Sequence, residues 1–244
     1  RSGIDLTERM SAWAARRVRE LETEGLCGFI FKSGSPSSGM ERVKVYDEHG
    51  MPGKDGVGMF ARAFMEHFPL LPVEEEGRLH DPVLREHFIE SIFALQRWRS
   101  LLASNPGIGA LVDFHTRHKL LIMAHSPELY REMGRLVAGA KGRPPALVRQ
   151  EYETLLLRVV RSRATVRRQV NVLQHAMGYF KKLLDADEKR ELLDLIAGYG
   201  DGTLPLIVPI TMIRHLVRRH KISYLAGQWY LEPHPLELKL RNHS

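Results

Sequence analysis

The sequence predicts an α/β N-terminal portion, an incomplete Rossmann-like layer, followed by an all-α helical domain. A short apolar run at 26–31 and an alternating stretch at 41–46 flank a Gly/Ser/Pro-rich loop, with helical patterns before and after them, an order typical of an α/β layer. Beyond the breaker-rich stretch 105–109 only helical patterns follow. We therefore expect a partial α/β domain with a connecting helix at 1–104 and an all-helical domain at 110–244.

The elements of the first domain follow from local signals. Apolar positions at helical spacing predict a helix over 4–24, closed by Gly25 as a C-cap. Four glycines and a proline make 50–58 a loop. Asp81, an N-cap followed by proline at N1, starts a helix that runs to about residue 103. The other elements are strands at 26–31 and 41–46, a helix at 61–68 and an extended segment at 69–73.

All regular elements expected in the second domain are helices. The longest helix is predicted from Ala146 to Leu184, because its apolar residues fall within a narrow stripe at 100° per residue. Two prolines make 203–210 an irregular segment. The remaining elements are helices at 110–124, 126–138 and 185–196, a basic helix ending at 221, a last helix at 223–231 and an extended tail.

Charge is distributed unevenly along the chain. Residues 1–110 contain 14 Lys and Arg against 16 Asp and Glu, whereas residues 111–244 contain 22 against 13. A basic half favours a polyanionic partner, through phosphate contacts and counterion release, although such an excess also aids solubility. The single cysteine excludes an intramolecular disulfide and fits a reducing cytoplasm. No apolar stretch reaches the roughly eighteen residues of a membrane span, so we expect no membrane partner.

The segment Lys32-Ser-Gly-Ser-Pro-Ser-Ser-Gly39 follows the first apolar run directly. A strand that ends in such a loop places side chains and free backbone N–H groups at a sheet edge, where open α/β sheets bind ligands. The alternative is a plain strand–turn–strand connection built from turn formers. The loop is therefore a candidate site on position alone.

With its flanks, this loop resembles the signature of bacterial thiouracil desulfidases. The segment Gly28-Phe-Ile-Phe-Lys-x-x-Ser-Pro-Ser-x-Gly39, followed by Glu41-Arg-Val-Lys-Val-Tyr46, is similar to a motif that reads Ser-Pro-Ser-Cys-Gly in that family. The resemblance implies that the cysteine position, Ser38 here, belongs to three thiolates that hold a 4Fe–4S cluster. The candidate catalytic residues are then Lys32, Ser35, Ser37 and Ser38, and the cofactor-binding position is Ser38.

Several motifs of the second half resemble a YbgA-type domain and occur in that family's order. They are Phe114-His-Thr-Arg-His-Lys119, Met123-Ala-His-Ser-Pro127, Asn171-Val-Leu-Gln-His-x-x-Gly-Tyr-Phe-Lys181, Pro205-Leu-Ile-Val-Pro209 and Tyr224-Leu-x-x-Gln-x-Tyr-Leu231. Fused to a desulfidase domain, this domain occurs in enzymes that remove sulfur from 4-thiouridine in tRNA. The resemblance spans Ile4 to Asn242 and implies tRNA or another RNA as partner, with no specificity for DNA.

The chain departs from the desulfidase family at its cluster ligands. Ser38 supplies an alcohol, a poor ligand for iron compared with a thiolate. The family's other two cluster cysteines belong to a segment upstream of Arg1, which we expect to have been cut away or left out. The remaining Cys27 lies in an apolar run and is predicted to be a buried small hydrophobe rather than a reactive thiol. Since one thiolate cannot hold the cluster, we expect the chain as given to lack it.

Basic and polar residues of the second half are the candidate RNA contacts. Arg161, Arg168 and His175 recur every seven residues and would stack along one side of the long predicted helix, as a row that follows a phosphate backbone; a solvated arginine-rich face is the alternative. The polar signature residues could read a nucleotide or satisfy buried backbone at Gly178. The full set is Arg117, Lys119, Arg158, Arg161, Arg168, Asn171, His175, Tyr179, Lys181 and Arg218.

Two further clusters have alternative interpretations. The run Glu74–Glu76 could mark a metal or acid–base site, but three adjacent carboxylates are too close in sequence to converge from one regular element, and charge runs are usually solvated. His115 and His118 could share a metal, yet no carboxylate or cysteine lies at the expected offset. A basic, phosphate-facing helix that also presents His125 is favoured.

These features together predict a tRNA 4-thiouridine desulfidase, which removes sulfur from a thiolated pyrimidine without net redox change and is expected to be inactive in the chain as given. No phosphate-binding lysine loop, nucleophile elbow or dinucleotide fingerprint supports a hydrolase or nucleotidase. The alternatives are a catalytically silent RNA-binding protein of the same family and a helical protein–protein interaction module.

Overall fold

The computed structural model describes residues 4–242. The start of the first predicted domain (1–3) and the end of the second (243–244) lie outside the described residues. The chain divides into two compact units, residues 1–92 (unit 1) and 93–244 (unit 2). Unit 1 combines helices with two small sheets and unit 2 is helical, which confirms the predicted fold class. The division falls within helix α3 (Pro82–Ala103), whereas the sequence places the boundary in the loop at 105–109.

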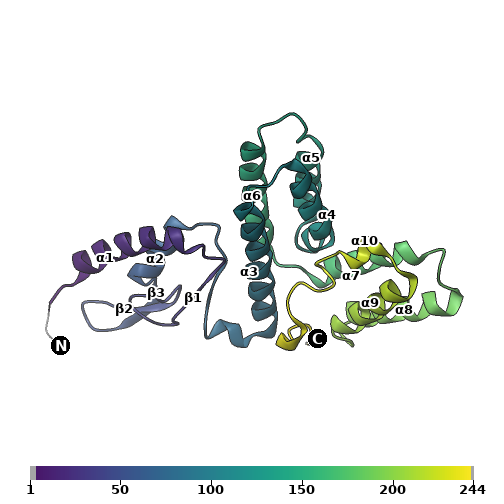
Figure 1. Cartoon of the computed structure of the whole chain (residues 1–244). Helices are drawn as coiled ribbons and strands as arrows, with labels where there is room; N and C mark the ends of the chain where they lie inside the picture. The colour runs from purple at the N-terminus through teal and green to yellow at the C-terminus, as the bar shows by residue number, and fades with distance from the viewer. Residues whose placement is uncertain (1–3, 243–244) are drawn as a thin grey trace. The chain divides into compact units, whose positions relative to one another are not determined.

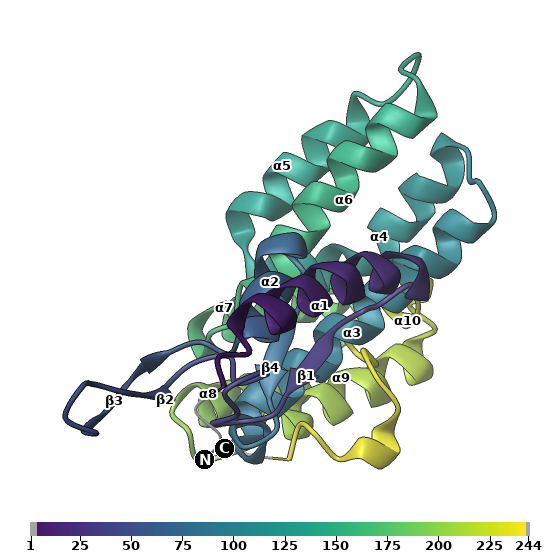
Figure 2. The same ribbon diagram turned by 90° about the vertical axis from the view of Figure 1, so that its left-hand side faces the viewer.

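Unit 1 contains two separate two-stranded sheets (Figures 1 and 2). Strand β1 (Phe29–Phe31) pairs in parallel with β4 (Val73–Glu75), and β2 (Val43–Tyr46) pairs antiparallel with β3 (Pro52–Gly56). The connection from β1 to β4 contains the β2–β3 hairpin, which extends to one side in Figure 2, and helix α2 (Met59–His67). The unit also has α1 (Thr7–Glu20) and the 3-10 helices η1 (Leu21–Glu24) and η2 (Arg78–His80).

Aromatic side chains form the core of unit 1 between α2 and β1. The Phe64 ring is fully buried and its centroid lies 4.5 Å from that of Phe29 and 5.4 Å from that of Phe31. Phe60, one turn earlier on α2, lies 5.9 Å from Phe29. Aromatic pairs at these distances add to the stabilisation that comes from burial. They fix α2 against β1, with the start of α2 beside the loop that follows the strand.

The prediction of a loop at 50–58 is wrong, because Pro52–Gly56 forms strand β3. The Asp47 carboxylate sets the preceding turn by accepting hydrogen bonds from the backbone N–H groups of His49 (2.9 Å) and Met51 (2.8 Å). Gly50 adopts the positive φ of 77° that the turn requires. A glycine-rich hairpin strand resembles a loop in sequence, because its pairing is supplied by the partner strand rather than by its own propensity.

Unit 2 consists of the end of α3 and a series of helices joined by short turns (Figure 1). They are α4 (Ile108–His125), α5 (Pro127–Ala138), α6 (Pro145–Arg161), α7 (Val166–Met177), η3 (Gly178–Phe180), α8 (Ala186–Gly200), α9 (Ile207–His220), α10 (Ser223–Ala226) and η4 (Leu236–Leu238). One continuous core joins α4, α7, α8 and α9 through fully buried residues such as Leu173, Ile210 and Ile213. This core holds the basic helix α9 against α4 and α7.

The single helix predicted from 146 to 184 is two helices. The chain leaves the helical conformation at Ser162 (φ −86°, ψ 119°), and the Thr165 hydroxyl caps α7 by accepting a hydrogen bond from the Arg168 backbone N–H at 3.3 Å. The His125 ring bonds the Ser162 carbonyl, which gives that backbone group a partner outside the helix. The apolar stripe continues across the break without glycine or proline, so periodicity alone does not reveal it.

Three shorter predictions for unit 2 also need correction. The segment expected to be irregular at 203–210 is partly helical, since α9 begins at Ile207 and Pro209 lies in its first turn, where no N–H donor is needed. The last helix, expected over 223–231, ends at Ala226. The tail expected to be extended contains η4. Among residues 4–242, no helix combines the length and apolarity needed to cross a membrane.

Candidate functional sites

Hydrogen bonds within the serine-rich loop after β1 pair several of its backbone N–H groups with oxygen atoms of the loop itself. The Ser35 hydroxyl lies 3.1 Å from the Ser37 hydroxyl and accepts a hydrogen bond from the Ser38 N–H at 3.2 Å. The Gly39 N–H donates to the Ser35 carbonyl at 2.8 Å. The expectation of free backbone N–H groups is therefore wrong for Ser38 and Gly39. The three serine side chains are half-buried and close together, as expected.

Carbonyl groups of the same loop cap the N-terminus of α2. The Ser37 carbonyl accepts hydrogen bonds from the N–H groups of Phe60 (2.8 Å) and Ala61 (3.2 Å), donors of the kind that the first turn of a helix leaves unpaired. A Cβ atom at Gly58 would lie 2.6 Å from the Ser37 carbonyl. Glycine at this position therefore permits the close approach of loop and helix.

Buried carboxylates of β4 hold the end of the loop, contrary to the expectation that the acidic run is solvated. The side chain of Glu75 is 4% exposed, and its carboxylate accepts hydrogen bonds from the backbone N–H groups of Met40 (2.7 Å) and Glu41 (3.4 Å). The carboxylate of Glu74, which is 7% exposed, accepts a bond from Arg78 at 2.6 Å. We call Glu74, Glu75 and Glu76 the carboxylate latch.

The third carboxylate of the latch holds the start of the loop. Glu76 accepts a hydrogen bond from the Ser33 N–H at 2.7 Å and forms an ion pair with Lys32 at 2.8 Å. The hydrogen bond with Glu76 raises the pKa of the Lys32 ammonium, and the same bond lowers the pKa of the Glu76 carboxyl. The candidate catalytic Lys32 is thus exposed and paired with a carboxylate beside the serines.

The side chains around this loop do not fit a 4Fe–4S cluster. The loop presents hydroxyl groups, and Cys27 lies before β1 whereas Ser38 lies beyond the other end of that strand. In the described part of the chain, no three His, Cys, Asp or Glu side chains are grouped so as to hold a metal ion. Cys27 is half-buried rather than buried, with its sulfur 3.8 Å from the Gly25 carbonyl oxygen, which corrects its assignment as a fully buried hydrophobe.

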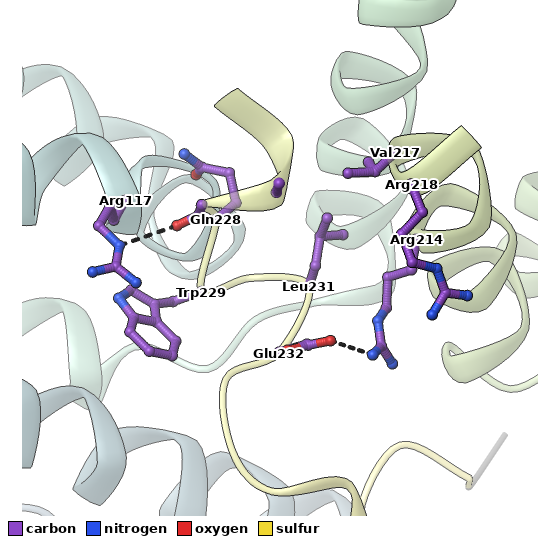
Figure 3. Close-up of a pocket in the computed structure, with 10 residues that line it drawn as sticks. Arg117, Arg214, Val217, Arg218, Gln228, Trp229, Leu231 and Glu232 are labelled. Atoms are coloured by element: carbon purple, nitrogen blue, oxygen red, sulfur yellow. Dashed lines mark hydrogen bonds and ion pairs between the residues drawn. The ribbon is translucent and has the colours of Figure 1, made fainter. Parts of the chain in front are cut away.

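A basic pocket of about 290 Å³ lies in unit 2 between α4, α9 and the segment that follows α10. Figure 3 shows Arg117 on one side and Arg214 and Arg218 on the other. The other lining residues are Val217, Ala226, Gly227, Gln228, Trp229, Leu231 and Glu232. We call this the arginine pocket. It brings together two of the candidate RNA-binding residues, Arg117 and Arg218, which are 101 positions apart in the sequence.

Gln228 fixes the segment after α10 against α4. Its side-chain amide accepts a hydrogen bond from the Leu120 N–H (3.2 Å) and donates one to the Thr116 carbonyl (2.7 Å). The neighbouring Trp229 N–H donates to the Arg117 carbonyl at 2.9 Å. Because Gln228 is 3% exposed, these bonds satisfy polar groups in the interior. They place the Trp229 indole beside the Arg117 guanidinium, whose carbon lies 4.6 Å from the ring centroid.

Comparison with known proteins agrees with this division into two parts. Residues 1–76 match the family model described as 2-thiouracil desulfurase, and residues 119–235 match one described as protein of unknown function (DUF1722). The chain is 34% identical over 152 residues to "Uncharacterized protein YbgA" of Escherichia coli (strain K12), a match that covers 62% of this chain and 90% of that protein. The chain belongs to the YbgA family. No solved structure matches it. A 2-thiouracil desulfurase-like domain thus precedes unit 2, which contains the DUF1722 match and which we call the YbgA-family part.

The predicted arginine row of the YbgA-family part does not lie along one helix. Arg161 ends α6, whereas Arg168 and His175 lie in α7 beyond the break. The Arg168 guanidinium donates to the His125 carbonyl at 2.7 Å, so it closes the turn between helices. Arg158 on α6 lies 3.7 Å from a Glu132 carboxylate oxygen on α5. The spacing of seven therefore does not produce a continuous row.

The polar signature residues of α7 lie on its exposed face. Asn171 and His175 are exposed, and within residues 4–242 neither side chain hydrogen-bonds to the backbone at Gly178. The stacked ring of Tyr179 lies 5.0 Å from that of Tyr224 on α10, at 15°. The second interpretation, in which these residues satisfy the backbone at Gly178, therefore does not hold for Asn171 and His175, and their side chains are accessible. Lys181 is exposed beyond η3, and Lys119 is half-buried on α4 outside the arginine pocket.

The three histidines of α4 belong to the core, so the expectation that they lie on a phosphate-facing surface is wrong, although Arg117 of the same helix is exposed. His115 and His118 are 2% and 0% exposed, with His115 Nδ1 3.2 Å from the Tyr152 hydroxyl and His118 Nδ1 2.7 Å from the Phe114 carbonyl. Burial lowers the pKa of His115 to about 4 and that of His118 to about 3. His125 is also buried. The His115 and His118 rings are therefore neutral at physiological pH.

Neither the role of Trp229 nor the meeting of Arg117 with Arg218 was predicted from the sequence. The tryptophan lies directly after the signature glutamine, Gln228, whose buried bonds to α4 explain why that motif residue is polar. An aromatic residue beside a polar motif position, close in sequence to a basic helix, was the available signal.

Proposed function

We propose that this chain is the scaffold and RNA-binding part of a desulfidase that acts on 4-thiouridine in tRNA. The observation that carries the proposal is the fusion of a 2-thiouracil desulfurase-like domain at 1–76 to a YbgA-family part that contains the arginine pocket. Unit 2 carries 24 Lys and Arg against 13 Asp and Glu, and unit 1 carries 12 against 16. A polyanionic substrate accounts for this charge difference. With tRNA as substrate, the protein works in the cytoplasm.

Within this proposal, the serine-rich loop lies nearest the thiolated base, bordered by Lys32, Ser35, Ser37 and Ser38. The resemblance to desulfidases implies a 4Fe–4S cluster in the family, but the described residues do not fit one, so no chemical step is assigned to them. A catalytically silent tRNA-binding protein is the second candidate. The hydroxyl in place of a thiol at Ser38 favours it.

The test compares Ser38 with the variant Ser38→Cys, both produced anaerobically from the complete coding sequence and incubated with tRNA that contains 4-thiouridine. Sulfide release and loss of the 4-thiouridine absorbance are measured, and tRNA binding is measured separately by filter retention. We expect both proteins to bind tRNA and only Ser38→Cys to release sulfide.

Three other outcomes would change the proposal. tRNA binding without sulfide release by either protein would leave the silent RNA-binding protein as the better description. Equal sulfide release by both would show that position 38 is not a ligand. Absence of tRNA binding by both would overturn the proposal and favour a protein–protein module.

A further inference from the structure

The arginine pocket carries positive charge that its own residues do not neutralise. Of the three arginines, Arg214 forms an ion pair with Glu232, the one carboxylate among the lining residues. In the part of the chain that the structure describes, neither Arg117 nor Arg218 forms an ion pair with a carboxylate. Two exposed guanidinium groups without a carboxylate partner therefore line one cavity, and their combined positive potential attracts an anion.

The two walls of the pocket hold their arginines differently. On α9, Arg214 and Arg218 are one turn apart, and the Arg214 side chain is 20% exposed and held by Glu232. On α4, the Arg117 Nε donates to the Gly227 carbonyl at 3.4 Å, an interaction drawn in Figure 3. This bond uses Nε and leaves the two terminal nitrogen atoms of the guanidinium without a hydrogen bond to the described residues. Planar guanidinium groups of this kind bind the oxygen atoms of phosphate in pairs.

Trp229 supports Arg117 rather than offering a free face to a base. The guanidinium carbon of Arg97 lies 3.9 Å from the indole centroid and that of Arg117 lies 4.6 Å from it. Cation–π contacts at these distances orient the guanidinium without using its N–H groups. Arg97 in turn donates to the Pro233 carbonyl, which ties the segment 229–233 to α3 within unit 2. The indole is thus a positioning group for Arg117.

We propose that Arg117, Arg214 and Arg218 form a phosphate-binding pocket and that Trp229 positions Arg117 in it. The proposal rests on the proposed function only for the source of the phosphate, which is a phosphodiester of the tRNA backbone. The cavity of about 290 Å³ lies near the lower limit of ligand pockets and suits a phosphate with part of its sugar better than a whole stacked nucleotide. A chain of phosphates would reach it across the basic surface of unit 2.

The main experiment measures tRNA binding of the full chain by filter retention as salt is raised. The double substitution Arg117→Ala/Arg218→Ala is expected to weaken binding at least tenfold and to flatten the slope of log K against log salt by roughly one to two, because each phosphate contact contributes just under one unit. Arg131→Ala, a matched loss of exposed charge on α5, should change affinity less than twofold. If the wild-type chain binds tRNA and the double substitution leaves the affinity and the salt slope unchanged, the assignment of a phosphate-binding pocket is overturned.

Trp229→Phe and Arg117→Lys separate positioning from charge. Both keep the net charge of the pocket, yet each should reduce affinity about three- to tenfold, since the lysine loses the planar fork and the smaller ring orients Arg117 less firmly. Circular dichroism melting checks that each variant is folded. Affinities equal to the wild-type value for both folded variants would contradict the positioning role of the indole.

A second titration keeps the inference distinct from the proposed function. Uridine 5′-monophosphate is added to the full chain in a calorimeter, with polyglutamate as a carboxylate competitor. The phosphate pocket is supported if the wild-type chain binds the nucleotide and the double substitution abolishes this binding. If tRNA does not bind to the same protein, nucleotide binding identifies free nucleotides as the source of the phosphate. Failure of the wild-type chain to bind the nucleotide, together with binding of polyglutamate, would overturn the phosphate assignment and indicate an acidic protein partner.

Discussion

Replacing Glu75 tests whether the carboxylate latch holds the serine-rich loop. The buried Glu75 carboxylate accepts one short hydrogen bond, from Met40 at 2.7 Å, and one long one at 3.4 Å. A hydrogen bond to a charged group contributes about 1.5–3 kcal/mol, and a donor left without a partner costs a similar amount. We expect Glu75→Ala to lower the free energy of opening this loop by about 2–3 kcal/mol. Glu75→Gln retains an acceptor oxygen and should cost about 1 kcal/mol.

Hydrogen exchange of the full chain, followed for the peptide that contains residues 32–41, measures this loss. Since 1.4 kcal/mol corresponds to a factor of ten, exchange in Glu75→Ala should be faster by roughly 30- to 140-fold. Glu66→Ala, an exposed carboxylate on α2, is the matched control and should stay within about 0.5 kcal/mol of wild type. If the loop exchanges at the same rate in Glu75→Ala as in this control, the latch does not hold the loop.

Two further predictions concern a buried histidine and the close contact between the serine-rich loop and α2. Burial lowers the pKa of His118 to about 3, so this ring stays neutral in the folded protein. In the unfolded chain the ring binds a proton once the pH falls below the ordinary histidine pKa of about 6.5, so the free energy of unfolding should be highest above this pH and about 2 kcal/mol lower at pH 5. Thermal melting should show this loss in the control variant His175→Gln but less of it in His118→Gln. Gly58→Ala, which would bring a Cβ to 2.6 Å from the Ser37 carbonyl, should cost about 2 kcal/mol or more in urea unfolding, whereas Gly109→Ala, with open space around it, should not.

Several helix ends are explained by residues within one turn of the end. Ser126 accepts the N–H of Leu129 at 3.2 Å, and Asp185 forms a capping box with Glu188. Gly25 adopts the left-handed conformation expected of a C-cap, with φ 63°. In each case the hydrogen bond or torsion is local, so neighbouring residues carry the whole signal.

The features that build the two sites depend on partners distant in the sequence. Glu75 meets Met40, 35 residues away, so a run of three glutamates gives no sign that it lies on a buried strand. The break before α7 was readable in part, because Thr165 is a good N-cap, but the apolar stripe that crosses it indicated continuity. The buried histidines resemble a basic surface in composition, and only the packing of Tyr152 and Phe114 around them reveals otherwise.

The way the arginine pocket is assembled has a consequence for the newly synthesised protein. One wall comes from α4, and the segment that completes the pocket follows 110 residues later, where the Gly227 carbonyl receives Arg117. A nascent or truncated chain that stops before Gln228 contains all three arginines but lacks the bonds that bring Trp229 to α4. Contacts between such distant residues form late in folding. A ribosome-bound chain therefore displays scattered basic residues, and a shaped binding site arises only when synthesis of unit 2 is nearly complete.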